Sequence, residues 1–166
     1  MTFYSLILDL SYCIFMNDPE YETLGYLIED LDGDGVDELF IGANPADGPG
    51  SGSSVIYDLF TMKDGQVVHV FDGWDRNRYY MCTDGTIANE GSAGAEYTFY
   101  SYYNFKNGEL QIVESVFSDI DENSESHWYQ SDKEAYEDES NEITLEEAAD
   151  AIDKHTYKQI SYTYFN

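Results

Sequence analysis

One short acidic run, from Asp30 to Leu39, constrains this chain more than any other part of its sequence. The run reads Asp-Leu-Asp-Gly-Asp-Gly-Val-Asp-Glu-Leu, so carboxylates stand at its first, third, fifth and ninth positions and glycine at its sixth. Carboxylates crowded into a tight turn repel one another unless a cation lies between them. Calcium takes about 6–8 oxygen ligands and tolerates irregular geometry, so this spacing predicts a calcium-binding loop.

The expected ligands follow from their positions in the loop. They are four carboxylates and one backbone carbonyl, those of Asp30, Asp32, Asp34, Glu38 and Val36. Gly35 permits the sharp turn that brings them together, because glycine tolerates backbone angles that other residues avoid. An acidic turn that lies in solvent without a metal is the alternative interpretation.

The loop differs from an EF-hand, which needs a bidentate glutamate at position 12 and a helix after it. Position 12 of this loop is Ile41, and residues 39–42 (Leu-Phe-Ile-Gly) read as a short buried strand. We therefore expect the loop to join two strands, Tyr26–Glu29 and Glu38–Gly42.

Turn residues predict a β-meander after this loop. Asp-Gly or Asn-Gly between apolar runs is a strong hairpin pattern, because type I′ turns need positive φ at both central residues. Three such turns stand at residues 63–65, 83–85 and 106–108. The strands expected around them, with one further candidate, are Val55–Met62, Gln66–Phe71, Arg78–Cys82, Thr86–Asn89, Tyr97–Phe105, Glu109–Phe117 and residues 128–130. Aromatic residues on both faces of Tyr97–Phe105 indicate a central strand.

Helical patterns stand at both ends of the chain. Apolar residues at helical spacing predict an amphipathic helix over residues 3–16. Thr144 and Glu147 form a capping-box pattern that opens a second helix, expected to end near His155. Ile160–Phe165 reads as a final strand. A chain of 166 residues suits one domain, so we expect a single α+β domain over residues 1–166: an antiparallel β-meander with an N-terminal and a C-terminal helix.

The charge of the chain restricts its partners. Thirty-four Asp and Glu residues against seven Lys and Arg give a formal net charge of −27. Such a field repels nucleic acid and anionic membranes and attracts cations and basic protein surfaces. We therefore expect a protein partner with a basic surface and no direct nucleic-acid binding. The oligomeric state stays open.

The cysteines and apolar runs restrict the properties of the chain less than its charge does. Cys13 and Cys82 lie far apart, and we interpret them as free thiols, although a single disulfide is the alternative. No run of 18 apolar residues predicts a membrane span. The start of the chain lacks the basic residues of a signal peptide. The chain is therefore expected to be cytoplasmic if this start is native, and extracellular or at the cell surface if an export signal has been removed.

The segment from Gly25 to Asp30, running into the acidic loop up to Leu39, resembles the calcium-loop domains common in gut clostridia. Their loop is related to the FG-GAP and VCBS-like calcium sites of integrin-type propellers. The resemblance extends through residues 63–65, residues 84–92 and the terminal helix and strand, and covers about residues 24–166. It implies a metal-binding, non-catalytic domain and names no partner.

Two function classes remain after these observations. The first is a non-enzymatic calcium-binding domain with an acidic protein-interaction surface. The second is an acidic nucleic-acid mimic that inhibits a basic nucleic-acid-binding enzyme, as phage-encoded inhibitors of the anti-CRISPR type do. An enzyme is a distant third, because close carboxylate pairs are expected by chance in so acidic a chain. The three histidines show no metal-ligand spacing, and we interpret them as ordinary strand, loop or helix residues.

Overall fold

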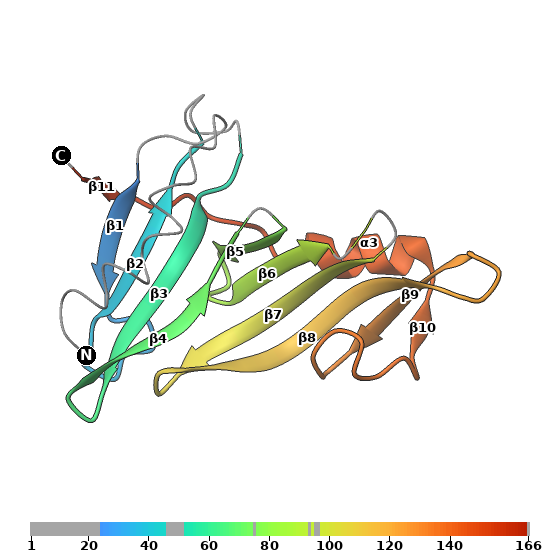
Figure 1. The fold of residues 1–166 in the computed structure, drawn as a ribbon, viewed down its shortest axis with the longest axis horizontal. Coiled ribbons are helices and arrows are strands. Elements are labelled where there is room, and N and C mark those ends of the chain that lie inside the picture. The colour runs from blue at the N-terminus through green and yellow to red at the C-terminus, as the bar shows by residue number, and fades with distance from the viewer. Residues whose placement is uncertain (1–23, 46–51, 75, 93, 95–96, 166) are drawn as a thin grey trace.

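Antiparallel strands make up most of the part of the chain that the structure describes. The computed structural model describes residues 24–45, 52–74, 76–92, 94 and 97–165. The strands are β1 Gly25–Glu29, β2 Glu38–Ala43, β3 Val55–Lys63, β4 Gln66–Asp72, β5 Asn77–Met81, β6 Ile87–Ser92, β7 Thr98–Lys106, β8 Glu109–Ile120, β9 Ser126–Ser131, β10 Glu142–Ile143 and β11 Thr163–Tyr164. One helix, α3 (Leu145–Asp153), follows β10 (Figure 1).

These strands form one sheet. Its order is β10-β9-β8-β7-β6-β5-β3-β2-β1-β11, and β4 pairs with β3 beside this path. Most strands pair with their neighbours in the sequence, so the predicted β-meander is confirmed. Strand β3 is an exception to this pairing of consecutive strands. It pairs with β4 along most of its length and also with β5, but only at Ile56.

The predicted α+β class is wrong. The described residues are mostly strand, and their only helix is α3, which is nine residues long. So short a helix covers a small part of one sheet, where it packs on β8 and β9, and does not form a second layer. The N-terminal helix expected over residues 3–16 lies outside the described residues.

Two of the three predicted hairpin turns have the expected backbone. Asp64 and Gly65 have φ of 52° and 74°, and Asn107 and Gly108 have φ of 53° and 77°. The turn at residues 83–85 differs, because only Gly85 has a positive φ, of 90°. Its amide donates to the carbonyl oxygen of Cys82, so the loop is one residue longer than a type I′ hairpin.

Strand β7 lies between β6 and β8, which confirms its predicted central position. Tyr102 on one face and Phe105 on the other belong to different apolar clusters. The larger cluster contains Phe40, Ile56, Leu59, Phe71, Met81, Ile87, Phe105, Ile160 and Tyr162. The aromatic residues of β7 therefore contribute to packing on both faces of the sheet.

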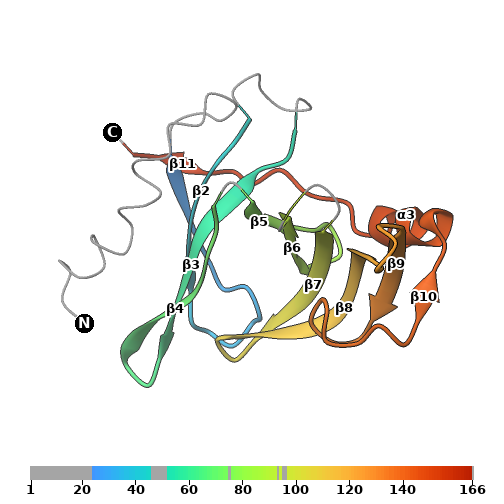
Figure 2. The ribbon, with the colours of Figure 1, turned by 45° about the vertical axis from the view of Figure 1, so that its right-hand side comes forward.

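The sheet bends, so that hairpins far apart in its strand order meet at one end (Figure 2). Lys63, beside the β3–β4 turn, forms an ion pair of 2.6 Å with Glu109, beside the β7–β8 turn. The backbone amide of Asn107 also reaches the β1–β2 loop, where it donates to Asp32. The acidic loop consequently lies against a turn from the other half of the sheet.

Helix α3 begins with the capping box that the sequence predicts. The Thr144 hydroxyl accepts from the amide of Glu147 at 3.2 Å, and the Glu147 carboxylate accepts from the amide of Thr144 at 2.8 Å. The helix ends at Asp153, two residues before the expected end. No helix in the described ranges is long and apolar enough to cross a membrane, as predicted.

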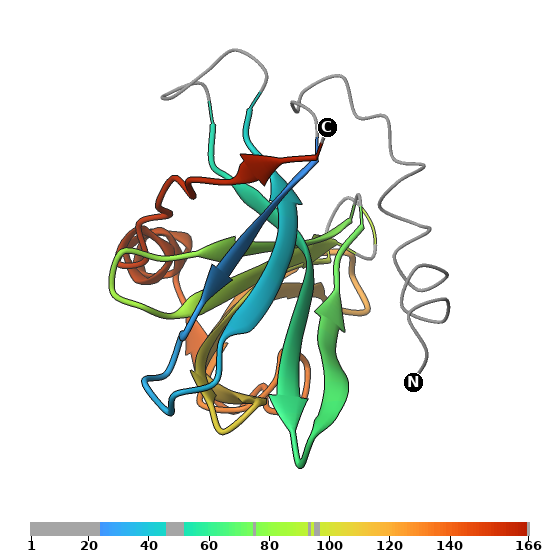
Figure 3. The same ribbon diagram turned by 90° about the vertical axis from the view of Figure 1, so that its left-hand side faces the viewer.

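Residues 154–165 form a C-terminal strap that runs from α3 back to the edge of β1 (Figure 3). Ile160 and Tyr162 of the strap are buried in the larger cluster, and the Tyr162 hydroxyl donates to the carbonyl oxygen of Val55. The final strand is shorter than predicted and pairs β11 with β1. The strap thus runs from α3, which follows β10 at one end of the strand order, to β11 at the other end.

Candidate metal centre

The acidic loop joins β1 to β2, as predicted, and two glycines set its path. Gly33 and Gly35 have φ of 76° and 88°, a region that L-residues rarely adopt. Apart from each glycine and its two chain neighbours, no atom lies within 4 Å of the position that a Cβ would take. The glycines are therefore required by the backbone conformation and not by lack of space.

Asp30 closes the loop through its side chain. Its Oδ1 accepts hydrogen bonds from the amides of Gly33 at 2.8 Å and Asp34 at 3.1 Å, and its Oδ2 accepts from Gly35 at 3.0 Å. Short acidic side chains commonly bond to backbone amides a few residues ahead. Three amides thus orient the carboxylate at the first position of the loop.

Glu38 is the buried member of the site. It is 1% exposed at the start of β2. Its Oε1 accepts from the Thr61 hydroxyl at 2.7 Å, and its Oε2 accepts from the Leu31 amide at 2.9 Å. Within the described ranges no Lys, Arg or His nitrogen forms an ion pair with it. A buried carboxylate without a cationic partner is costly, so its position favours a cation beside it.

Three of the four predicted carboxylate ligands come together. Carboxylate oxygens of Asp30, Asp32 and Glu38 lie within 4.8 Å of one another. Asp34 lies outside this group, and its Oδ1 accepts from the Val36 amide at 2.8 Å. The arrangement offers hard, anionic oxygen ligands at one point, which suits Ca²⁺ better than a metal that prefers sulfur or nitrogen.

Asp32 links the loop to the other half of the sheet. Its Oδ2 accepts a hydrogen bond of 2.6 Å from the backbone amide of Asn107. Asn107 is the first of the two residues in the β7–β8 turn that have a positive φ. A cation bound between Asp30, Asp32 and Glu38 would therefore lie beside the contact between two distant turns.

Two residues that support the site were missed by the sequence analysis. Thr61 and Asn107 each donate a hydrogen bond to a predicted ligand. Thr61 lies on β3, which pairs with β2 next to Glu38. A predicted pairing of these strands would have pointed to Thr61, but no local pattern connects Asn107 with Asp32.

Carboxylates also gather at the opposite end of the sheet, in a region called here the acidic end, residues 119–153. This region has one lysine and 14 acidic residues: Asp119, Asp121, Glu122, Glu125, Asp132, Glu134, Glu137, Asp138, Glu139, Glu142, Glu146, Glu147, Asp150 and Asp153. It contains β9, β10 and α3 (Figure 1). Its lysine, Lys133, already pairs with Asp138 at 2.8 Å, and His127 pairs with Glu142 at 2.6 Å. Most of the negative charge is thus left for solvent or a partner.

Fold and loop together define an antiparallel β-sheet protein with a carboxylate cluster at one end and an acidic surface at the other. No family model matches the chain, and no curated protein or solved structure matches it. The resemblance to calcium-loop domains consequently depends on the quoted residues alone, and membership of that family is a proposal.

Proposed function

We propose that this chain is a non-enzymatic calcium-binding domain that presents an acidic surface to a protein partner. The burial of Glu38 carries the proposal. Its carboxylate is 1% exposed and lies beside those of Asp30 and Asp32, so three negative charges converge without a cationic side chain among the described residues. A bound Ca²⁺ would neutralise this repulsion.

Calcium would complete its coordination with the remaining loop oxygens. Asp34, the Val36 carbonyl and water are the proposed additional ligands, at about 2.3–2.6 Å. The Asp34 carboxylate has to turn toward the ion, away from its hydrogen bond to the Val36 amide. Calcium tolerates such adjustable ligands, whereas magnesium demands near-octahedral geometry.

The proposed role of the ion is structural. Asp32 contacts the β7–β8 turn and Glu38 contacts Thr61 on β3. An ion that holds both carboxylates would therefore stabilise the end of the sheet where three hairpins meet. In a chain with a net charge of −27, it would also reduce the self-repulsion that opposes folding.

Calorimetric titration with Ca²⁺, together with thermal melts in Ca²⁺ and in chelator, tests the metal. We expect one Ca²⁺ per chain and a higher melting temperature with the ion. At a free concentration of about 100 Kd, it stabilises the native state by about 2.7 kcal/mol. Asp30→Asn should weaken binding, whereas Asp150→Asn, an exposed change on α3, should not. No binding heat and identical melts would refute the site.

The acidic end is the proposed interaction surface. Its carboxylates outnumber its cations, and both Lys133 and His127 are already paired. Electrostatic attraction speeds association with a basic surface and is screened by salt over about 8–10 Å. The proposed partner is therefore a protein with a positively charged groove or face.

A nucleic-acid mimic is the second candidate, favoured by the concentration of carboxylates on one end of the molecule. Such a protein would occupy the nucleic-acid channel of a basic enzyme. Binding to a panel of basic nucleic-acid enzymes, measured with and without competing DNA or RNA, distinguishes the two. Displacement by nucleic acid supports the mimic. Binding to a basic protein that persists when nucleic acid is added supports the interaction domain.

A matched pair of variants tests whether the acidic end is the surface used. Glu122→Gln with Glu139→Gln removes two exposed charges from it, and Asp64→Asn with Asp72→Asn removes two exposed charges elsewhere. The first pair should slow association with the partner, and the second should change it less. Equal effects would show that net charge alone, and not this surface, governs binding.

A further inference from the structure

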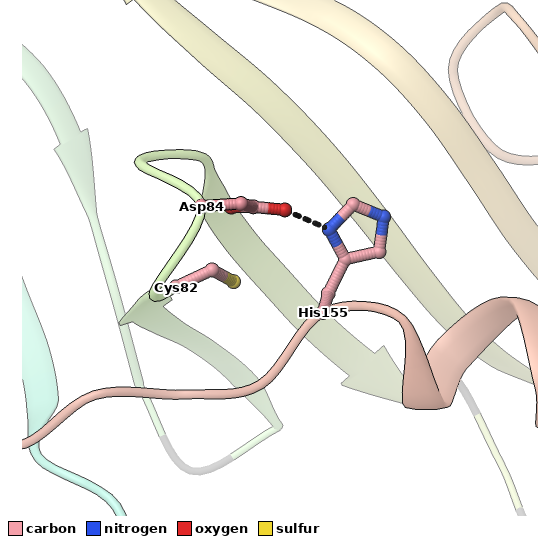
Figure 4. Close-up of side chains that lie close together, drawn as sticks. All are labelled: Cys82, Asp84 and His155. Atoms are coloured by element: carbon pink, nitrogen blue, oxygen red, sulfur yellow. Dashed lines mark hydrogen bonds and ion pairs between the residues drawn. The ribbon is translucent and has the colours of Figure 1, made fainter.

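A second cluster of potential ligands, of different chemistry, lies away from the acidic loop. The sulfur of Cys82, a carboxylate oxygen of Asp84 and a ring nitrogen of His155 lie within 4.8 Å of one another (Figure 4). Cys82 is a buried free thiol, as expected from the sequence, whereas Cys13 lies outside the described residues. The interpretation of His155 as an ordinary residue overlooked this group, because 71 positions separate it from Asp84.

Three backbone segments create this juxtaposition. Cys82 follows β5, Asp84 lies in the β5–β6 turn, and His155 is the second residue of the strap that follows α3. The strap is held against the turn by a hydrogen bond of 2.8 Å from the Thr83 amide to the carbonyl oxygen of Thr156. A bridge between Cys82 and Tyr157 continues the pairing. The cluster therefore lies where the strap joins the sheet.

The His155 ring is firmly oriented. Its Nδ1 lies 2.9 Å from Asp84 Oδ2, and its Nε2 lies 2.9 Å from Glu114 Oε1. The ring stacks on Tyr102 with a centroid distance of 3.7 Å, and the histidine side chain is 8% exposed. Glu114 is itself held by Gln130, whose Nε2 donates to it at 2.6 Å. Ligating histidines commonly donate their second ring N–H to a carboxylate in this way.

We propose that Cys82, Asp84 and His155 form a site for Zn²⁺ or a similar borderline transition metal. A thiolate and an imidazole select such ions over Ca²⁺, which prefers oxygen. His155 would bind through Nδ1 while its Nε2–H donates to Glu114. Binding releases the thiol proton of Cys82 to solvent, and the lone pair of His155 Nδ1 takes the metal.

The distances require a small adjustment. A tetrahedral zinc with ligands at about 2.0–2.3 Å holds neighbouring ligand atoms roughly 3.3–3.8 Å apart. Side-chain movements of about an ångström or less satisfy this requirement, with Asp84 moving away from His155 and Cys82 approaching both. The Asp84 side chain is 41% exposed, so the metal can enter from its side, and water fills the fourth position.

The thiol is protonated before the metal arrives. Burial raises the pKa of Cys82, although a hydrogen bond with Thr86 partly opposes the shift. A coordinated metal deprotonates a thiol outright through its own charge. Affinity should accordingly rise with pH, because the thiol proton of Cys82 competes with the metal.

Titration with Co²⁺ as a spectroscopic probe for zinc tests the site. The background is Cys13→Ser, which leaves Cys82 as the one thiol, with Ca²⁺ in excess to occupy the acidic loop. We expect a thiolate-to-Co²⁺ charge-transfer band that saturates at one Co²⁺ per chain and disappears when Zn²⁺ is added. Absence of the band would overturn the site and leave His155 as an ion-paired side chain only.

Variants assign the ligands. Cys82→Ser should abolish the band, His155→Asn should weaken Co²⁺ binding strongly, and Glu114→Gln should keep the band with affinity lower by about 10–100-fold. The matched control is His127→Asn, since His127 lies in a comparable group with Asp121 and Glu125 that lacks sulfur. Unchanged affinity in His155→Asn, with the fold verified by circular dichroism, would refute the assignment, as would an equal loss in His127→Asn.

Discussion

The carboxylate of Asp32 accepts a hydrogen bond from the backbone amide of Asn107, 75 residues further along the chain, at 2.6 Å. The contact joins the β1–β2 loop to the β7–β8 turn. It makes the proposed calcium ligand part of the tertiary structure, so metal binding and stability should be coupled.

Asp32→Ala tests this coupling. The substitution removes a proposed Ca²⁺ ligand and the acceptor for Asn107. In chelator we expect a loss of about 1 kcal/mol or less in the free energy of unfolding, because an exposed hydrogen bond contributes little and carboxylate repulsion is relieved. In Ca²⁺ the loss should be larger, because the ion's contribution falls as well. Denaturant unfolding under both conditions measures the difference, and equal losses would argue against a metal at Asp32.

Gly33→Ala and Gly65→Ala form a matched pair. Their φ values are 76° and 74°, and at neither position does an atom beyond the adjacent residues lie within 4 Å of the place that a Cβ would take. Each alanine should therefore cost about 1–2 kcal/mol of stability from backbone strain alone. Only Gly33→Ala should also weaken Ca²⁺ binding, because the Gly33 amide orients Asp30. Calorimetric titration measures the Ca²⁺ affinity of both variants, and equal affinities would contradict the prediction.

Thr61→Val removes the hydroxyl that donates to buried Glu38 while preserving the shape of the side chain. Loss of a hydrogen bond to a charged group costs about 1.5–3 kcal/mol, and we expect a loss of this size in chelator. A bound Ca²⁺ should reduce the loss, because the ion stabilises the same carboxylate. Thr61→Ser retains the hydroxyl and serves as the control. If Thr61→Val lost equal stability with and without Ca²⁺, the ion would not be near Glu38.

His69 and Asp58 predict a pH dependence. The Asp58 carboxylate, which is fully buried, lies 2.8 Å from Nε2 of His69. Its hydrogen bond raises the pKa of His69 above the usual value of 6.5, although burial opposes the shift. Because the folded pKa is the higher one, the stabilisation is fully present below about pH 6.5. It is lost as pH rises through the folded pKa.

The free energy of unfolding should therefore decrease above pH 6.5 in the parent by more than in His69→Gln. The glutamine amide still donates to Asp58 but does not titrate. Denaturant melts between pH 6 and 9 provide the measurement, and NMR titration of the His69 ring gives the folded pKa directly. A parent and a variant with parallel pH profiles would show that this pair does not contribute.

Local chemistry explains which elements were predictable. The turns at Asp64-Gly65 and Asn107-Gly108 formed as expected, and so did the capping box of Thr144 and Glu147, because each depends on residues at most three positions apart. The turn at Gly85 was wrong in detail, since its loop contains one more residue than a type I′ hairpin. The α+β class was wrong because helical spacing does not tell whether a helix is long enough to form a layer.

The sequence by itself determined the positions of the carboxylates and glycines in the acidic loop, since these are set within a few residues. It also determined the meander, whose consecutive strands pair through short turns. Only the tertiary structure decided that the Asn107 amide reaches Asp32, that Thr61 donates to Glu38, and that His155 lies between Asp84 and Glu114. These contacts depend on the bend of the sheet and the path of the strap, which arise from the packing of the whole chain and leave no local pattern.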